Sequence, residues 1–239
     1  MEKLNEKVLL NKEVIIFDLD GTLIDTINIW NKIDQKTLNK FNIKNIKLNE
    51  VQNIKDNYLM CNTEGDIYIN YIKYLVKKYN LNVDYEIFYK ERKIIANKLL
   101  LKAKLKPNVL KTLNELKRKQ YILVLATSSS NNEIELYKRN KNIRNLFDYF
   151  DLIVTSSDVK KKKPNPEIYE FIMKKIRLPK KKFLIFEDSY MGLLCAKNIK
   201  IEKVFVNNKY FEKDINAINR ITEYKLNKFN ELYKLLKRI

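Results

Sequence analysis

The 239-residue chain contains no histidine, and it has only two cysteines, three glycines and four prolines. Two cysteines, Cys61 and Cys195, do not make the disulfide framework that small secreted proteins use, which favours a reducing compartment. No apolar run approaches the ~18 residues that a membrane-spanning helix needs. The first seven residues carry acidic side chains, and no long apolar segment follows them, so they do not resemble a secretory signal. We therefore expect a cytoplasmic protein with no membrane partner.

Acidic residues are also in deficit, with 29 Asp and Glu against 48 Lys and Arg, which gives a formal net charge of +19. Such a charge could suit nucleic acid as a partner. The lysines are spread along the whole chain, however, and no nucleic-acid-binding module or aromatic stacking motif accompanies them. A basic nucleic-acid-binding protein is therefore kept as a remote alternative, and the charge is expected to attract anionic substrates.

The most informative motif follows the apolar run at residues 14–17. Residues 18–22 read Asp-Leu-Asp-Gly-Thr, so the carboxylates of Asp18 and Asp20 stand where a buried strand is expected to end. Side chains at the carboxyl edge of a parallel sheet line the ligand-binding crevice of open α/β folds. Gly21 relieves backbone strain in the turn, because glycine tolerates backbone angles that other residues resist. Two acids on such a turn suit a divalent cation and a phosphate group, with an aspartate as the attacking group.

Three further polar clusters stand shortly after apolar runs. They are Thr127 and Ser128 after residues 122–126, Lys163 and Pro164 after residues 152–154, and Glu187 and Asp188 after residues 183–186. In this order, the four clusters resemble the four motifs of the haloacid dehalogenase-like (HAD) hydrolase superfamily, over residues 14 to about 192. The long insertion between the first and second motifs resembles the helical cap of the subgroup that contains β-phosphoglucomutase and phosphoglycolate phosphatase-like phosphatases.

The resemblance implies a role for each of these residues. Asp18 would attack phosphorus and form an aspartyl phosphate, and Asp20 would act as general acid and then as general base. The residues implied in phosphate binding are Gly21, Thr127, Ser128 and Lys163. The residues implied in holding Mg²⁺ are Asp18, Asp20 through its carbonyl, Asp188, and Glu187 either directly or one contact further out.

Strand and helix patterns alternate along the chain. Apolar runs predict strands at residues 14–17, 121–126, 152–155, 183–187 and 203–206, with helices at residues 107–116, 131–141, 166–176, 189–198 and 230–236. Asn165, Pro166 and Glu167 are typical of a helix start, as a capping residue, a first-turn proline and an acid. The alternation predicts an α/β fold, with a Rossmann-like parallel sheet covered by helices on both faces.

The long segment before the second motif has a different pattern. Residues 25–104 show only the three-to-four-residue apolar spacing of helices. We expect them to form an inserted α-helical cap domain, and residues 1–24 and 105–239 to form the HAD-like α/β core domain.

The type of reaction follows from two positions in the sequence. Haloacid dehalogenases of this fold generally lack the second aspartate of the first motif, so Asp20 favours phosphoryl transfer. The related mutases carry a cap-hinge histidine twelve residues after the nucleophile, where this chain has Trp30. We therefore expect a Mg²⁺-dependent phosphatase that hydrolyses small phosphorylated metabolites, such as sugar phosphates, through an aspartyl phosphate. A β-phosphoglucomutase-like phosphosugar mutase is the alternative.

Residues of the cap are harder to interpret. Trp30 is the only tryptophan, and it would either pack in the cap beside Ile33 and Phe41 or face the mouth of the site. A helix junction that could face the ligand is expected within residues 55–66, which include Thr63. Cap selectivity and oligomeric state are left open.

Overall fold

The computed structural model describes residues 1–62 and 65–239 of the chain. Its centre is a seven-stranded sheet in which all the paired strands are parallel, in the order β1-β7-β6-β5-β2-β3-β4. The strands are β1 (Glu2–Lys3), β2 (Val14–Phe17), β3 (Ile122–Ala126), β4 (Leu152–Val154), β5 (Phe183–Glu187), β6 (Glu202–Val206) and β7 (Tyr224–Leu226). The prediction of an α/β fold with a parallel sheet is confirmed.

Three central strands bring the polar motifs to one edge of this sheet. β2, β3 and β5 are almost wholly apolar and buried, as expected for parallel strands that are covered on both faces. Phe17 at the end of β2 lies in register with Leu125 of β3 and Phe186 of β5. The polar residues Asp18 and Glu187 follow these positions directly, so they emerge side by side at the carboxyl edge.

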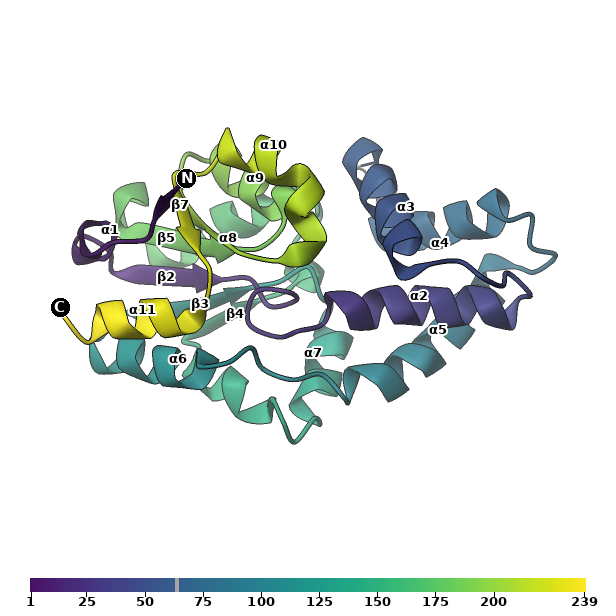
Figure 1. The fold of residues 1–239 in the computed structure, drawn as a ribbon, viewed down its shortest axis with the longest axis horizontal. Coiled ribbons are helices and arrows are strands. Elements are labelled where there is room, and N and C mark those ends of the chain that lie inside the picture. The colour runs from purple at the N-terminus through teal and green to yellow at the C-terminus, as the bar shows by residue number, and fades with distance from the viewer. Residues whose placement is uncertain (63–64) are drawn as a thin grey trace.

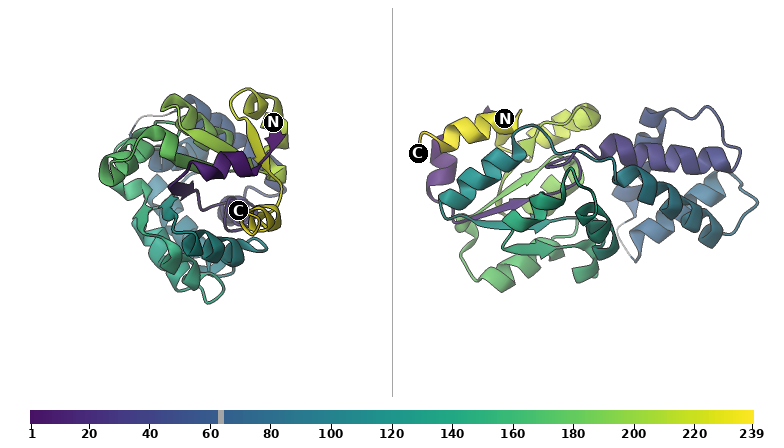
Figure 2. Two further views of the ribbon diagram at one scale, coloured as in Figure 1. Left: turned by 90° about the vertical axis from the view of Figure 1, so that its left-hand side faces the viewer. Right: turned by 90° about the horizontal axis from the view of Figure 1, so that it is seen from below.

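Helices cover both faces of the sheet (Figure 1 and Figure 2). They are α1 (Glu6–Leu10), α6 (Val109–Arg118), α7 (Asn131–Lys138), α8 (Glu167–Ile176), α9 (Tyr190–Asn198), α10 (Ile215–Asn219) and α11 (Phe229–Leu236). Successive side chains of a strand point to opposite faces. Ile15 and Phe17 therefore pack in one core with α6 and α11, whereas Val14 and Ile16 pack in another with α8 and α9.

Apart from α6, which packs on the sheet, most of the chain between β2 and β3 forms a helical lobe. It contains α2 (Ile27–Lys40), α3 (Leu48–Cys61), α4 (Ile67–Lys78) and α5 (Tyr85–Leu100). These helices enclose a core of their own, which includes Leu38, Leu75 and Phe88. Figure 1 shows the lobe on the side toward which β2 runs, beyond the carboxyl edge of the sheet. The inserted helical segment is therefore confirmed.

Two connections join this lobe to the sheet-containing part. They lie side by side, because the N–H of Asp25 donates to the carbonyl of Lys104 (3.0 Å), and Ile24 forms a β-bridge with Leu105. The predicted division into residues 25–104 and the remainder stays a prediction, and these contacts lie at its two boundaries.

The structure also contains elements that the sequence patterns do not predict, namely β1, α1, α10 and β7. Each is two to five residues long, too short for a periodic apolar pattern. Helix α8 begins at Glu167, one residue later than predicted, and the side-chain oxygen of Asn165 accepts a hydrogen bond from the Glu167 N–H (3.1 Å).

Two further expectations concern the cap and the compartment. Thr63, within the expected helix junction, lies outside the described residues. Among the helices that the structure describes, none combines the length and the apolar character needed to cross a membrane. The cytoplasmic location stays a prediction.

Candidate functional site

Lys163 connects three of the four motifs. It lies in the loop between β4 and α8, and its Nζ donates to Asp18 Oδ1 (2.9 Å), to Glu187 Oε2 (2.8 Å) and to the carbonyl of Ala126 (3.0 Å). Asp18 follows β2, Ala126 ends β3 and Glu187 ends β5. An ammonium group has three N–H donors, so all three are used inside this cluster.

Burial makes the charges of this cluster strongly interdependent. Asp18 is 6% exposed and Glu187 is 1% exposed. Burial, followed by repulsion from Glu187, raises the pKa of Asp18 well above its ordinary value, although Lys163 opposes this shift. Burial alone would lower the pKa of Lys163, but Asp18 and Glu187 outweigh it and hold that pKa well above its ordinary value. The ammonium is therefore kept charged beside the Asp18 carboxylate.

Asp188 lies beside this cluster and is oriented by two donors. Its Oδ1 accepts from Thr22 Oγ1 (3.0 Å), and its Oδ2 accepts from Asn208 Nδ2 (2.6 Å). Burial, and then the charge of Glu187, raise the pKa of Asp188 to about 7, while the nearby Lys106 ammonium opposes the shift. Asn208 stands just after β6, so a fourth strand end contributes to the site.

Asp18, Glu187 and Asp188 form a group that could hold a metal ion. One carboxylate oxygen from each lies within 4.8 Å of the others, and all three residues are buried. The three carboxylates outnumber the two nearby ammonium groups, those of Lys163 and Lys106, so the group carries excess negative charge that a cation would neutralise. Oxygen-only donors of this kind are the ligands that Mg²⁺ and Ca²⁺ prefer. The chemistry of the donor set therefore fits a hard divalent cation.

Both oxygens of Glu187 already have partners. Its Oε2 accepts from Lys163, and its Oε1 accepts from Ser189 Oγ (2.8 Å). Both oxygens of Asp188 are engaged as well, by Thr22 and Asn208, so the position of Glu187, directly on the ion or one contact beyond it, stays a prediction.

Gly21 allows the first and fourth motifs to approach each other. Its φ angle of +87° lies in the left-handed region that favours glycine. A Cβ atom at this position would lie 2.1 Å from Asp188 Oδ2. The N–H of Gly21 donates to the carbonyl of Ile24 (2.8 Å), so it is used within the turn. Phosphate binding by Gly21 stays a prediction.

The second motif follows β3. Thr127 is buried, and its Oγ1 accepts from the N–H of Ser129 (3.0 Å), which shapes the loop. The side chain of Ser128 lies near the hydroxyl of Tyr68, which belongs to α4 of the helical lobe. A predicted phosphate-binding residue thus lies beside the cap.

Asp20 is surrounded by hydrogen-bond donors. Its Oδ1 accepts from Thr26 Oγ1 (2.7 Å), Trp30 Nε1 (2.9 Å) and Tyr137 Oη (2.6 Å). Its Oδ2 accepts from Ser129 Oγ (2.7 Å). Of the two roles considered for Trp30, this contact favours a place at the site, although its ring also packs against the core.

Sequence reasoning missed several residues of this arrangement, among them Tyr68, Ser129, Tyr137 and Asn208. Ser129 had a signal, because it adjoins the second motif. Tyr137 stands nine residues after Ser128, and Tyr68 and Asn208 stand further from the motifs in sequence. Only the tertiary fold brings these three to the site.

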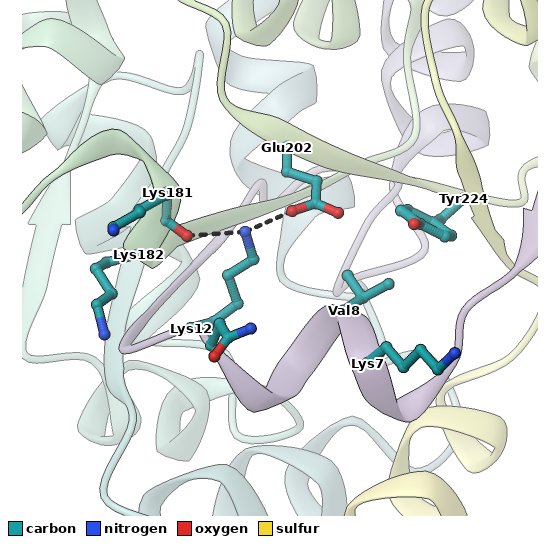
Figure 3. Close-up of a pocket in the computed structure, with 8 residues that line it drawn as sticks. Lys7, Val8, Lys12, Lys181, Lys182, Glu202 and Tyr224 are labelled. Carbon is teal, nitrogen blue, oxygen red and sulfur yellow. Dashed lines mark hydrogen bonds and ion pairs between the residues drawn. The ribbon is translucent and has the colours of Figure 1, made fainter.

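A separate hollow lies at the opposite edge of the sheet (Figure 3). It is lined by Lys7, Val8, Asn11, Lys12, Lys181, Lys182, Glu202 and Tyr224, which precede or begin strands. Figure 3 shows the Lys12 ammonium bound to Glu202 and to the carbonyl of Lys181. Because the four motifs follow strand ends instead, this hollow is not part of the candidate site.

Comparison with known proteins relates this geometry to a family. The sequence profile of the haloacid dehalogenase-like hydrolases matches residues 15–206. A phosphorylated carbohydrates phosphatase of Thermotoga maritima is 28% identical over 194 residues, which cover 81% of this chain and 84% of that protein. A glyceraldehyde 3-phosphate phosphatase of Pyrococcus furiosus is 24% identical over 243 residues, covering 95% of this chain and 93% of that protein.

Solved structures share the fold. The crystal structure of CbbY from Rhodobacter sphaeroides in complex with phosphate superposes with a TM-score of 0.72 at 22% identity, covering 92% of this chain and 96% of that one. The matched profile spans the central strands of the sheet, from β2 to β6, together with the helical insertion and all four motifs. The chain therefore belongs to the haloacid dehalogenase-like hydrolase family.

Proposed function

We propose that the chain is a Mg²⁺-dependent phosphatase that hydrolyses phosphorylated carbohydrates, or similar small monoesters such as phosphoglycolate, through an aspartyl phosphate on Asp18. The observation that carries the proposal is the position of Lys163, whose ammonium contacts both Asp18 and Glu187 at the edge where Asp188 also lies. The attack of a carboxylate on a phosphate ester is opposed by charge repulsion. A buried ammonium at this place offsets that repulsion for the nucleophile and the phosphate together.

The first step forms the covalent intermediate. One oxygen of Asp18 forms a bond to phosphorus as the bond from phosphorus to the leaving oxygen breaks. The leaving oxygen keeps the electron pair of that bond and accepts a proton from Asp20. Thr127, Ser128 and Lys163 would bind the oxygens of the transferred group.

The second step releases phosphate. Asp20, now ionised, accepts a proton from a water molecule, whose oxygen bonds to phosphorus as the bond to Asp18 breaks. The products are inorganic phosphate and the original Asp18 carboxylate. Asp20 regains the proton that the next cycle requires.

Mg²⁺ fits the donor set described above. Asp18, Asp188 and the carbonyl of Asp20 would hold it, with Glu187 beside them, and it would supply positive charge to the phosphate group. The buried position of the three carboxylates supports this assignment, because a cation lowers the cost of keeping them all ionised.

Carbohydrate leaving groups are supported by the donors near the site. The Tyr68 hydroxyl and the Arg92 guanidinium come from the cap, and the guanidinium lies 5.3 Å from the centre of the Trp30 ring. Such donors suit a leaving group rich in hydroxyl oxygens. The phosphorylated carbohydrates phosphatase of T. maritima is in agreement with this class.

The mutase alternative has less support. An indole N–H can only donate a hydrogen bond, whereas an imidazole can also accept a proton. Trp30 stands where the mutases carry histidine, and the chain contains no histidine that could replace it. We expect no glucose 6-phosphate when the protein is incubated with β-glucose 1-phosphate and its bisphosphate. In the part of the chain that the structure describes, no specific observation supports nucleic-acid binding.

Phosphate release from p-nitrophenyl phosphate and from a panel of sugar phosphates tests the proposal. Asp18→Asn should abolish turnover while the protein stays folded, because an amide is a poor nucleophile and lacks the negative charge. Asp25→Asn is the matched control, since Asp25 is exposed in the same connection and outside the carboxylate group. EDTA should abolish the phosphatase activity of the wild type, and added Mg²⁺ should restore that activity. Turnover that persists in Asp18→Asn would refute the nucleophile, and equal rates with EDTA and with Mg²⁺ would refute the metal.

A further inference from the structure

Tyr137 holds one oxygen of Asp20 from the core side of the site. Its hydroxyl donates to Asp20 Oδ1 at 2.6 Å. The two other donors to this oxygen, Thr26 and Trp30, lie where the cap begins, whereas Tyr137 belongs to α7 beside the sheet. Tyr137 is therefore the contact to Oδ1 that does not depend on the position of the cap helices.

The fold fixes the Tyr137 ring closely. The residue is fully buried in the core that also contains Phe17 and Leu125. Helix α7 starts in a capping box, in which Ser130 and Glu133 bond each other's backbone N–H groups. A tyrosine side chain has two rotatable bonds before the ring and hydroxyl, so burial on an anchored helix leaves its hydroxyl little freedom.

The two oxygens of Asp20 have different surroundings. Oδ1 accepts three hydrogen bonds, and one of these comes from an indole, which can only donate. Oδ2 contacts the hydroxyl of Ser129, which can donate or accept as it rotates. Three donors thus anchor Oδ1 and leave Oδ2 as the oxygen whose partner can adapt when a leaving group arrives.

We propose that Tyr137 is a positioning residue for Asp20, which anchors Oδ1 so that Oδ2 is presented to the leaving oxygen. This inference rests on the proposed function, because it takes Asp20 to be the proton donor of the first step. Without the Tyr137 hydroxyl, the Asp20 carboxyl group loses its contact from the core and can rotate out of line. Proton donation to the leaving oxygen becomes slower, whereas the contacts to phosphate stay in place.

The dependence of the rate on the leaving group distinguishes this role from a merely structural one. An alkoxide is a strong base and needs a proton as it departs, whereas p-nitrophenolate departs without one. Since a positioned acid contributes roughly 10²–10⁴-fold to a rate, partial misplacement in Tyr137→Phe should cost about 10- to 100-fold in kcat for glycerol 3-phosphate. The loss for p-nitrophenyl phosphate should stay below about threefold, and KM for both esters should change less than about twofold, because Tyr137 makes no proposed contact with phosphate.

The experiment compares Tyr137→Phe and three further variants with the wild type on both esters, after thermal melting has shown that each is folded. Tyr71→Phe is the matched control, because Tyr71 is a buried cap tyrosine whose hydroxyl has no hydrogen-bond partner among the described residues. Ser129→Ala removes the donor to Oδ2 and should also slow the alkyl ester more than the aryl ester. Asp18→Asn tests the proposed function separately.

A selective loss on glycerol 3-phosphate in Tyr137→Phe, absent from Tyr71→Phe, supports the inference. Equal losses on the two esters, or rates matching Tyr71→Phe on both, would overturn it. If Asp18→Asn is inactive while Tyr137→Phe behaves as the wild type, the inference fails and the proposed function stands. If Asp18→Asn turns over both esters at the wild-type rate, the proposed function fails, and the inference fails with it.

Discussion

Replacing Gly192 with alanine should destabilise the protein although it places a better helix former in a helix. Gly192 is the third residue of α9, and its N–H donates to Ser189 Oγ (3.1 Å). A Cβ atom built on it would lie 2.0 Å from Glu187 Cδ and 2.1 Å from Glu187 Oε2. Real atoms do not approach so closely, so the Glu187 carboxylate must move.

The balance of two effects sets the magnitude. Alanine in place of glycine within a helix stabilises by about 0.5–1 kcal/mol. Movement of the Glu187 carboxylate breaks its bond to the Lys163 ammonium, and a hydrogen bond to a charged group contributes about 1.5–3 kcal/mol. The loss outweighs the gain, which leaves a net destabilisation of about 0.5–2.5 kcal/mol. Phosphatase activity should fall as well, because Lys163 and Asp18 share this cluster.

Urea unfolding and phosphate release test the reasoning together. The control is the same substitution in a Glu187→Ala background, where the carboxylate that would meet the new Cβ is gone. There Gly192→Ala should be neutral or stabilising by up to about 1 kcal/mol, so that the sign of the effect reverses between backgrounds. A single Gly192→Ala variant with wild-type activity and an unfolding midpoint at or above that of the wild type would refute the steric argument.

Two further predictions concern the cap. Burial disfavours the charged form of Asp34, but the charges of Arg92 and Lys55 outweigh burial and hold the pKa of Asp34 below its ordinary value. The Asp34 carboxylate therefore stabilises the fold above its unfolded-state pKa of about 3.9. This stabilisation is lost as the pH falls through the lower folded-state pKa. Asp34→Asn should therefore lower the free energy of unfolding by about 3–5 kcal/mol at pH 7. The difference in unfolding free energy from the wild type should become smaller toward about pH 3. An equal difference at both pH values, measured by urea unfolding, would contradict the prediction. Tyr68→Phe removes the cap hydroxyl that lies near Ser128. This substitution should raise KM for sugar phosphates about threefold to tenfold while the unfolding midpoint changes little. An unchanged KM would show that Tyr68 does not bind the substrate.

The sheet could be predicted from the sequence because its central strands are short runs of apolar residues. Parallel strands covered on both faces need such runs, and β2 and β5 supply them without interruption. The edge elements could not be predicted in the same way. Tyr224 and Lys225 in β7 are half-buried, and their strand is defined by pairing with β6 rather than by an apolar pattern.

The candidate site divides along similar lines. Asp18 and Lys163 follow strands and Glu187 ends one at the same edge, so sequence order and fold class together place them near one another. Tyr137 carries no such signal. Its position on α7 predicts only a buried apolar face, and its hydroxyl reaches Asp20 from 117 residues away in sequence. Contacts of this kind depend on how α7 packs on the sheet, which apolar spacing leaves undetermined.

Glycine composition offers a clue that local patterns do not. The chain has three glycines among its 239 residues, so each retained glycine is more informative than it would be in an ordinary sequence. Two of them stand against the acidic pair of the fourth motif: a Cβ at Gly21 would overlap Asp188, and a Cβ at Gly192 would overlap Glu187. Buried carboxylates cannot retreat into solvent, so the neighbouring backbone must lack a side chain. In a chain with so few glycines, Gly21 and Gly192 therefore mark the places where the packing around the carboxylates leaves no space for a side chain.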